Sequence, residues 1–394
     1  MQNLSNRRRA GPLLGIACLI SFTAFGQPPN RDQNTALGSL ELSWFYKPPV
    51  DGTSTQTMAT QFQHFILTRN DEDLRDHLRA AGVSTPILQY VRFDAIEDPC
   101  DGQCPCKAMP WRNQVAWEPG DFCEILSNHP DWFLRSKAGD LIAVKTGHQR
   151  HLWMDPGNPG WRAFWLNRVK MTQKELGWQG VFLDNVQASL GQFTKENIAL
   201  SNYPNEANFQ TAVKGFLDYI RNIYFIPEKR TLEGNIIFLP WGQEKVIWKY
   251  FLASMDGAML EDFAVGWHSG SFKTSQDWLN QIQSIEESQR MGKHVTLVAQ
   301  GDQEDLGRQT FALASYLLSN EGLASFRYTD SHGHYNQFWD YDGYQTARHL
   351  GRSLKPREKL ETGIWRRDFE NGYVTVDPDN HQGQIILLPQ HLNP

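Results

Sequence analysis

The sequence predicts a (β/α)8 TIM barrel with a small C-terminal antiparallel β-sheet. First, apolar runs typical of buried strands alternate with amphipathic helical runs over about 290 residues, as in parallel barrels. Second, no Gly-x-Gly-x-x-Gly or Walker-type loop follows any of these strands, which disfavours a doubly wound nucleotide-binding sheet. Third, the alternating runs after about residue 355 are typical of short antiparallel strands.

Eight strands and five long helices are expected in the barrel. The predicted strands cover residues 40–46, 87–93, 151–155, 180–184, 231–238, 257–262, 294–300 and 322–328. The predicted helices cover residues 159–176, 205–224, 244–254, 275–291 and 305–319. Pro159 fits the first turn of its helix, and Ser275 and Asp305 are the expected N-caps of theirs.

The N-terminus has the three parts of an export signal, predicted to end at residue 26. Three arginines (7–9) precede the apolar run "GPLLGIACLISFTAF", and small residues follow it. A lipid anchor at Cys18 is disfavoured because this cysteine comes early in the apolar run. No later stretch approaches the about 18 apolar residues of a membrane span. The protein is therefore expected to be secreted or periplasmic.

The mature chain is predicted to have three further parts. A polar linker covers residues 27–37, the barrel covers residues 38–350, and the C-terminal sheet region covers residues 351–394. Residues 95–150 are too long for a simple strand-to-helix connection, so we expect an excursion above the barrel.

Four of the five cysteines lie in this excursion, at positions 100, 104, 106 and 123. The fifth is Cys18, which would leave with the signal. In an oxidising compartment two local disulfides are the favoured interpretation, with three pairings open. A structural zinc site is the alternative, although Cys-x3-Cys-x-Cys is not the usual zinc spacing.

Composition narrows the possible partners. A net charge of -6 and a pI near 6.1 provide no basic surface, so nucleic acid is not an expected partner. No cofactor is expected. The loop at residues 330–345 contains His332 and His334 but is only a weak metal candidate. No Gly-x-Ser-x-Gly elbow of a serine hydrolase follows a strand.

Candidate site residues are those at the carboxyl ends of the strands, where TIM barrels carry their sites. Two strands end on a carboxylate followed by a second polar residue: Asp184 with Asn185, and Glu261 with Asp262. These carboxylates come from the fourth and sixth predicted strands, so they are expected to face one another across a pocket.

Strand periodicity predicts which neighbours point into the barrel, because residues two apart share a side. Phe182 should point inward with Asp184, and Met259 with Glu261. The residues expected to face the helices are Val181, Leu183, Ala258 and Leu260.

Two facing carboxyl groups are what glycoside cleavage requires, one as nucleophile or base and the other as general acid. The remaining candidates are polar residues that could orient sugar hydroxyls and aromatic residues that could stack on sugar rings. They are Trp44, Tyr46, Arg92, Asp155, Asn185, Trp241, Asp262, Trp267, Gln300 and Arg327. The competing interpretation is structural: either acid could cap a helix or pair with a cation such as Arg92 or Arg327.

The sequence also resembles a known family. The runs "HPDWFLRSKAGDLI", "LWMDPGNPGWRAFWLNRV", "GWQGVFLDNV", "MDGAMLEDFA" and "RRDFENGYVTVDP" resemble hypothetical glycosyl hydrolase family 15. They are more distantly similar to glycoside hydrolase family 114, the polygalactosaminidase-like enzymes. The resemblance implies a secreted barrel that acts on a polysaccharide. It also implies a nucleophile from strand four and an acid/base from strand six, here Asp184 and Glu261.

We therefore expect a secreted glycoside hydrolase with Asp184 and Glu261 as its catalytic residues. A non-catalytic carbohydrate-binding barrel and a cell-surface scaffold remain as alternatives, because fold does not determine function. The sequence leaves open which sugar is bound and the stereochemistry of cleavage.

Overall fold

The computed structural model describes residues 40–240, 242–267, 270–330 and 335–389. The predicted signal peptide, Cys18, the linker, Trp241, His332 and His334 lie outside these residues. No helix in the described ranges combines the length and the apolar character needed to cross a membrane.

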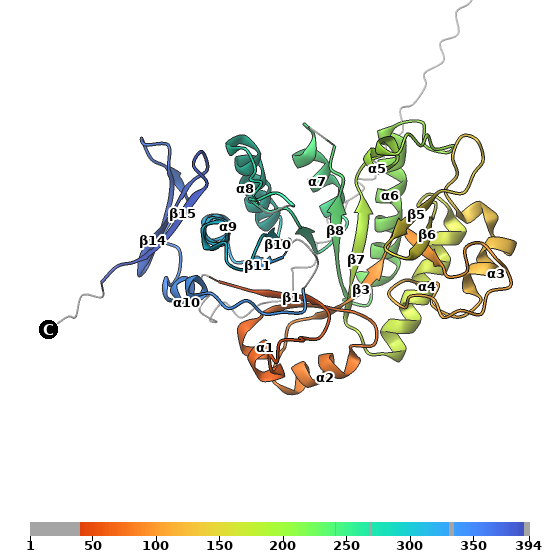
Figure 1. Cartoon of the computed structure of the whole chain (residues 1–394), viewed down its shortest axis with the longest axis horizontal. Helices are drawn as coiled ribbons and strands as arrows, with labels where there is room; N and C mark the ends of the chain where they lie inside the picture. The colour runs from red at the N-terminus through yellow and green to blue at the C-terminus, as the bar shows by residue number, and fades with distance from the viewer. Residues whose placement is uncertain (1–39, 241, 268–269, 331–334, 390–394) are drawn as a thin grey trace, which may run out of the picture. The chain divides into compact units, whose positions relative to one another are not determined.

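Eight parallel strands form the central sheet, in the order β1, β2, β3, β7, β8, β9, β10 and β11 (Figure 1). A parallel bridge between Leu42 and Phe326 joins the first strand to the last, so the sheet closes into the predicted barrel. The strands are β1 (Ser43–Tyr46), β2 (His64–Leu67), β3 (Ile87–Arg92), β7 (Gly180–Gln187), β8 (Thr231–Ile237), β9 (Gly257–Leu260), β10 (His294–Gln300) and β11 (Ala324–Thr329).

A helix follows each barrel strand and covers the outside of the sheet. These helices are α1 (Thr55–Gln61), α2 (Glu72–Ala80), α4 (Pro159–Glu175), α6 (Glu206–Ile220), α7 (Glu244–Leu252), α8 (Ser275–Arg290), α9 (Leu306–Ser319) and α10 (Asp342–His349). Asn158 caps α4, with Pro159 at its first position. Asp305 caps α9 as predicted, but Thr274 rather than Ser275 caps α8, because its hydroxyl accepts from the Asp277 amide.

One predicted barrel strand belongs elsewhere. Residues 151–155 were expected in the barrel, but β6 (Gln149–Trp153) lies in a separate three-stranded antiparallel sheet with β4 (Ala95–Asp98) and β5 (Ala143–Thr146). The missing barrel strand is β2, a run of four residues that the prediction passed over. The two errors compensate, so β7 is still the fourth barrel strand and β9 the sixth.

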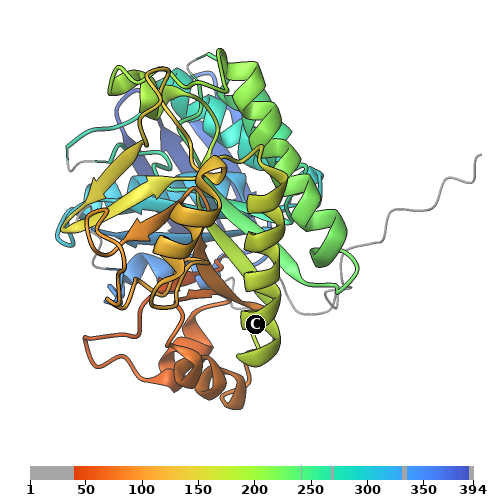
Figure 2. The same cartoon turned by 90° about the vertical axis from the view of Figure 1, so that its right-hand side faces the viewer.

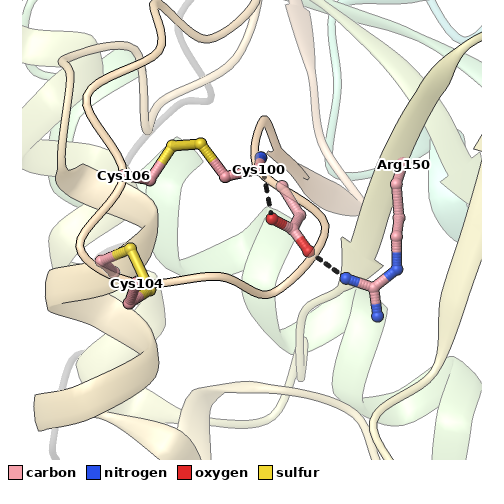
Figure 3. Close-up of a disulfide and its surroundings, with 6 residues drawn as sticks. Cys100, Cys104, Cys106 and Arg150 are labelled. Atoms are coloured by element: carbon pink, nitrogen blue, oxygen red, sulfur yellow. Dashed lines mark hydrogen bonds and ion pairs between the residues drawn. A yellow bond between two sulfur atoms is a disulfide. The ribbon is translucent and has the colours of Figure 1, made fainter.

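The predicted excursion lies between β3 and α4 and contains this small sheet and helix α3 (Asp121–Asn128). Figure 2 shows it in orange and yellow beside α4. Two disulfides, Cys100–Cys106 and Cys104–Cys123, confirm the favoured interpretation of the four cysteines. Figure 3 shows both disulfides. Beside them, Arg150 forms an ion pair with Asp98, whose carboxylate also accepts a hydrogen bond from the Cys100 amide.

Side chains inside the barrel form a separate apolar layer from those packed against the helices. The inner layer consists of Phe45, Ile66, Leu88, Tyr90, Phe182, Met259 and Val298. Val181, Leu183 and Ala258 are buried on the helix side, and Leu260 packs there. The predicted alternation along β7 and β9 is therefore confirmed.

The predicted C-terminal sheet is present and packs against α9. It consists of β12 (Glu358–Lys359), β13 (Trp365–Phe369), β14 (Gly372–Asp377) and β15 (Gln382–Leu387). Arg367 joins sheet and helix, because its guanidinium donates to the carbonyls of Leu317, Leu318 and Asn320 at the end of α9. A cation there satisfies helix-end carbonyls and complements the helix dipole.

The two disulfides should differ in the stability they give the excursion. Cys104–Cys123 spans 19 residues and Cys100–Cys106 spans 6, and the entropic benefit of a cross-link grows with loop length. Cys104→Ser with Cys123→Ser should lower the free energy of local unfolding by about 3 kcal/mol. The matched pair Cys100→Ser with Cys106→Ser should cost about 1 kcal/mol less. Hydrogen exchange within residues 95–153 measures both, and the reverse order would contradict the prediction.

Candidate active site

The candidate site begins at an irregularity in β7. Leu183 pairs with Gly234, but the next pair joins Val186 to Ile236, so β7 has one extra residue there. Asn185 takes a left-handed conformation with φ 62°, which asparagine tolerates better than most residues. Such a bulge re-aims side chains locally. Asp184 and Asn185 therefore both lie at the mouth of the barrel, although the strand continues to Gln187.

Asp184 and Glu261 are brought together by a third residue, Asn235. Its side-chain amide nitrogen donates to Asp184 Oδ1 at 3.2 Å and to Glu261 Oε2 at 2.7 Å. Asn235 lies on β8, between the strand that carries Asp184 and the strand that ends just before Glu261. One buried amide therefore fixes the separation of the two carboxyl groups.

The environment favours a protonated Glu261. Burial, with a further contribution from the nearby charge of Asp184, raises the pKa of Glu261 to about 8. Asp262 does not share this environment, because its carboxylate pairs with Lys273 and accepts from Gln281. Of the two adjacent acids, Glu261 is therefore the one suited to donate a proton at neutral pH.

Asp184 is surrounded by more groups that stabilise its ionised form. Burial, with a smaller contribution from the charge of Asp94, raises the pKa of Asp184, while hydrogen bonds from Tyr90 and Asn235 and the charge of Arg92 act in the opposite direction. Within the described residues, Glu261 accepts a side-chain hydrogen bond from Asn235 alone. We infer that when the pair holds one proton, it resides on Glu261 and leaves Asp184 ionised.

The two acids line a cavity of about 360 Å³, here called the mouth cavity. Its wall is partly aromatic: Tyr46 lies edge-on to both Tyr90 and Tyr335, with ring centroids 5.1 and 5.0 Å apart. The excursion contributes Trp111 and Asn113 to the same wall. Burial among these groups is the first cause of the raised pKa of both acids.

A second hollow of about 800 Å³, here called the side cavity, adjoins the first. Asn185 and Glu261 line both cavities. Asp262 and Trp267 line the side cavity, and 45% of the Trp267 side chain is exposed. An accessible indole of this kind offers a face on which a sugar ring can stack.

The structure thus brings six of the predicted site residues to these cavities, and Trp241 lies outside the described residues. The six are Asp184, Glu261, Tyr46, Asn185, Asp262 and Trp267. The side chain of Tyr46 reaches the mouth cavity because of its backbone conformation. Its φ of 76° breaks the alternation along β1 and turns the side chain inward, next to Phe45.

Trp44 and Arg327, two of the predicted binding residues, line neither cavity. Trp44 is fully buried on the helix side of β1, packs edge-on against Phe62 and donates to the carbonyl of Lys47. Arg327 lies over the Trp44 ring and donates to the carbonyls of Tyr335 and Gln337. Arg327 therefore holds the loop that presents Tyr335.

Arg92, Asp155 and Gln300 also lie outside the cavity walls. Arg92 forms a salt bridge with Asp94, in which Arg92 Nε lies 2.8 Å from Asp94 Oδ1. Asp155 follows a strand of the excursion rather than of the barrel, and accepts hydrogen bonds from Tyr203 and the Gly157 amide. Gln300 is buried, and neither atom of its side-chain amide has a hydrogen-bond partner within the described residues. None of these three residues lines the mouth cavity or the side cavity.

Sequence reasoning missed Asn235, Tyr90, Trp111 and Tyr335. A signal existed for Asn235, because Glu233 and Asn235 are two polar residues, two apart, in the otherwise apolar run "TLEGNIIF". Asn235 faces the mouth, whereas Glu233 lies with His64 and His294 near the other end of the barrel. No such signal marked Trp111 and Tyr335, which come from long loops.

Comparison with curated proteins finds no match. Among solved structures, the chain is similar to the glycoside hydrolase domain of PelA from Pseudomonas aeruginosa, at 15% identity and a TM-score of 0.45, covering 74% of this chain and 94% of that one. It is also similar to the maltogenic alpha-amylase AmyB from Thermotoga neapolitana, at 9% identity and a TM-score of 0.47, covering 87% of each chain. For TtGalA, an alpha-galactosidase from Thermus thermophilus, the identity is 14% and the TM-score 0.46, covering 87% of this chain and 67% of that one.

A family model described as hypothetical glycosyl hydrolase family 15 matches residues 108–373, a segment that contains both Asp184 and Glu261. The match confirms the resemblance noted in the sequence. Because it covers more than half of the chain, this chain belongs to hypothetical glycosyl hydrolase family 15.

Proposed function

We propose that this protein is a retaining glycoside hydrolase that cleaves a polysaccharide, with Asp184 as nucleophile and Glu261 as general acid and base. Family membership supports glycoside hydrolysis. The observation that carries the proposed mechanism is the Asn235 amide, which bonds both carboxyl groups at once.

The shared amide limits the distance between the two acids. The bonded oxygens can be no further apart than the two hydrogen-bond lengths of 3.2 and 2.7 Å together, about 6 Å. Retaining enzymes hold their carboxyl groups about 5–5.5 Å apart, whereas inverting enzymes need about 6.5–9.5 Å to admit a water molecule. The limit applies to one oxygen of each acid and lies nearer to the retaining range, which favours direct attack by a carboxylate.

Two balanced steps follow from this assignment. Asp184 attacks the anomeric carbon while Glu261 gives its proton to the departing glycosidic oxygen, so a glycosyl ester forms as the glycosidic bond breaks. Glu261, now ionised, then removes a proton from water, whose oxygen displaces Asp184 and completes hydrolysis. Tyr90 and Asn235 hold Asp184 in place and stabilise its negative charge.

The two cavities support a polymeric substrate. They meet at Asn185 and Glu261, so sugar units could occupy both sides of the acid that protonates the glycosidic bond. Trp267 on one side and the aromatic wall with Trp111 on the other offer stacking surfaces. A polysaccharide would use both cavities at once, which a single sugar could not.

Export is part of the proposal. The two disulfides of the excursion are typical of proteins that leave the reducing cytosol. The sequence of residues 1–26 supports the same conclusion.

Replacing Glu261 should remove most turnover without unfolding the protein. Glu261→Gln keeps the side-chain volume and removes the proton donor, so we expect a loss of about 10²–10⁴ in kcat. The assay is release of reducing ends by the purified protein across a panel of polysaccharides.

Asp262→Asn is the matched control, because this neighbouring carboxylate is already paired with Lys273. It should lose far less activity than Glu261→Gln. If Asp262→Asn were the inactive variant, the acid would be wrongly assigned. If the wild type bound glycans and released no product from any polymer, the binding-barrel alternative would replace the proposal.

The stereochemistry of the product is a separate prediction. A nucleophilic Asp184 requires two displacements, so the new reducing end should keep the anomeric configuration of the bond that was cleaved. Proton NMR of early products, before mutarotation, measures this directly. Inverted product would exclude Asp184 as nucleophile and leave the glycosidase assignment intact.

The pH dependence follows from the raised pKa of Glu261. A donor with a pKa of about 8 stays protonated through neutral pH, so the alkaline fall in kcat/KM should occur as the pH rises through about 8. Asp184→Asn removes the nearby negative charge and should lower the pKa of Glu261. Titration of the Glu261 carboxyl signal by carbon NMR checks this without any activity. An unchanged pKa in that variant would mean that the two acids are not coupled.

A further inference from the structure

A second polar cluster lies inside the barrel, at the end opposite the candidate active site. It consists of His64 at the start of β2, Glu233 on β8 and His294 at the start of β10. One ligand atom from each residue lies within 4.8 Å of the others. The inner apolar layer, which includes Ile66, Phe182 and Val298, separates this cluster from Asp184 and Glu261.

We propose that His64, Glu233 and His294 bind a divalent transition metal ion, with Zn²⁺ as the best match. Two imidazoles and one carboxylate form a ligand set that zinc favours. His64 Nε2 lies 3.0 Å and His294 Nδ1 lies 3.4 Å from Glu233 Oε2. Ligand atoms of a tetrahedral zinc ion are about 3.3 Å apart.

The surroundings of His294 are those of a metal ligand. Its other ring nitrogen, Nε2, lies 3.1 Å from the hydroxyl of Ser325, which accepts a hydrogen bond from Ser43 at 2.6 Å. A ligating histidine usually donates its second N–H to such an oxygen, which fixes the ring and its tautomer. The Ser325 hydroxyl can therefore direct His294 Nδ1 toward the cluster.

The backbone leaves space for the carboxylate of Glu233. A β-carbon at Gly257, on the neighbouring strand, would lie 2.9 Å from the Glu233 carboxyl carbon and 2.7 Å from the His294 carbonyl oxygen. Glycine at this position thus makes room for the Glu233 carboxylate and for the backbone of His294. The side chains of His64 and His294 are 11% and 13% exposed, so the cluster can be reached from the start of the strands.

Charge favours a bound cation. The Glu233 side chain is only 6% exposed, and its ion-pair partners within the described residues are the two histidines. A buried carboxylate is costly unless a positive charge balances it. A metal ion would supply that charge and tie β2, β8 and β10 together. The competing occupant is a proton shared with the imidazoles.

Metal binding by the purified protein separates these two occupants. After treatment with a chelator and dialysis, the wild type should take up one equivalent of Zn²⁺, and its Tm should rise when the metal is added. Co²⁺ in place of zinc should give the visible absorption bands of a four-coordinate nitrogen and oxygen site. Both readouts are independent of glycosidase activity.

Three variants locate the ion. Glu233→Gln should weaken zinc binding by at least about 100-fold, and Ser325→Ala should weaken it by about 10-fold because only the orientation of His294 is lost. His349→Asn removes an exposed imidazole that is not part of the cluster and should bind zinc as the wild type does. The proposal is overturned if the wild type takes up no zinc or cobalt, or if Glu233→Gln and Ser325→Ala both bind like the wild type. Should Glu233→Gln fail to fold, the cobalt spectrum and the Ser325→Ala affinity still decide.

Discussion

Two carboxyl groups that share one amide at a buried barrel mouth cannot both carry a charge at low cost. Asp184 and Glu261 are held by the same Asn235 nitrogen, in a cavity whose wall includes Tyr46, Tyr90 and Trp111. The state of lowest free energy is therefore the one in which the two acids together hold a single proton. Tyr90 also donates to Asp184, so in the proposed mechanism the proton resides on Glu261, and the neighbours of each acid assign its role as acid or nucleophile.

A second polar cluster, His64, Glu233 and His294, lies at the opposite end of the barrel from these two acids. Glu233 and Asn235 are two residues apart on β8, so both point inward, one toward each end of the barrel. The apolar layer between them prevents the two clusters from acting as one network. The packed middle therefore lets this barrel hold one polar cluster at its mouth and another at its base.

Much of the fold could be predicted from sequence, but the sheet to which a strand belongs could not. The run at 151–155 is as apolar as a barrel strand, yet residues 149–153 pair with β4 and β5, whereas β2 was missed although it has the same four-residue length as β1 and β9. Asp184 and Glu261 were predictable because strand ends and alternation are local properties. Trp44 was not, since one left-handed residue, Tyr46, decides which aromatic side chain at the end of β1 faces the cavity.

The strands and the loops of this barrel therefore have different roles in the proposed reaction. Asp184, Asn235 and Tyr90 lie on strands, where paired backbones hold the reacting groups rigidly. Trp111, Tyr335 and Trp267 lie on loops, and these residues form the surfaces that a sugar would contact. Membership of the family is thus informative about the bond that is broken, whereas the choice of sugar depends on the excursion and the loops, which vary most readily between related barrels.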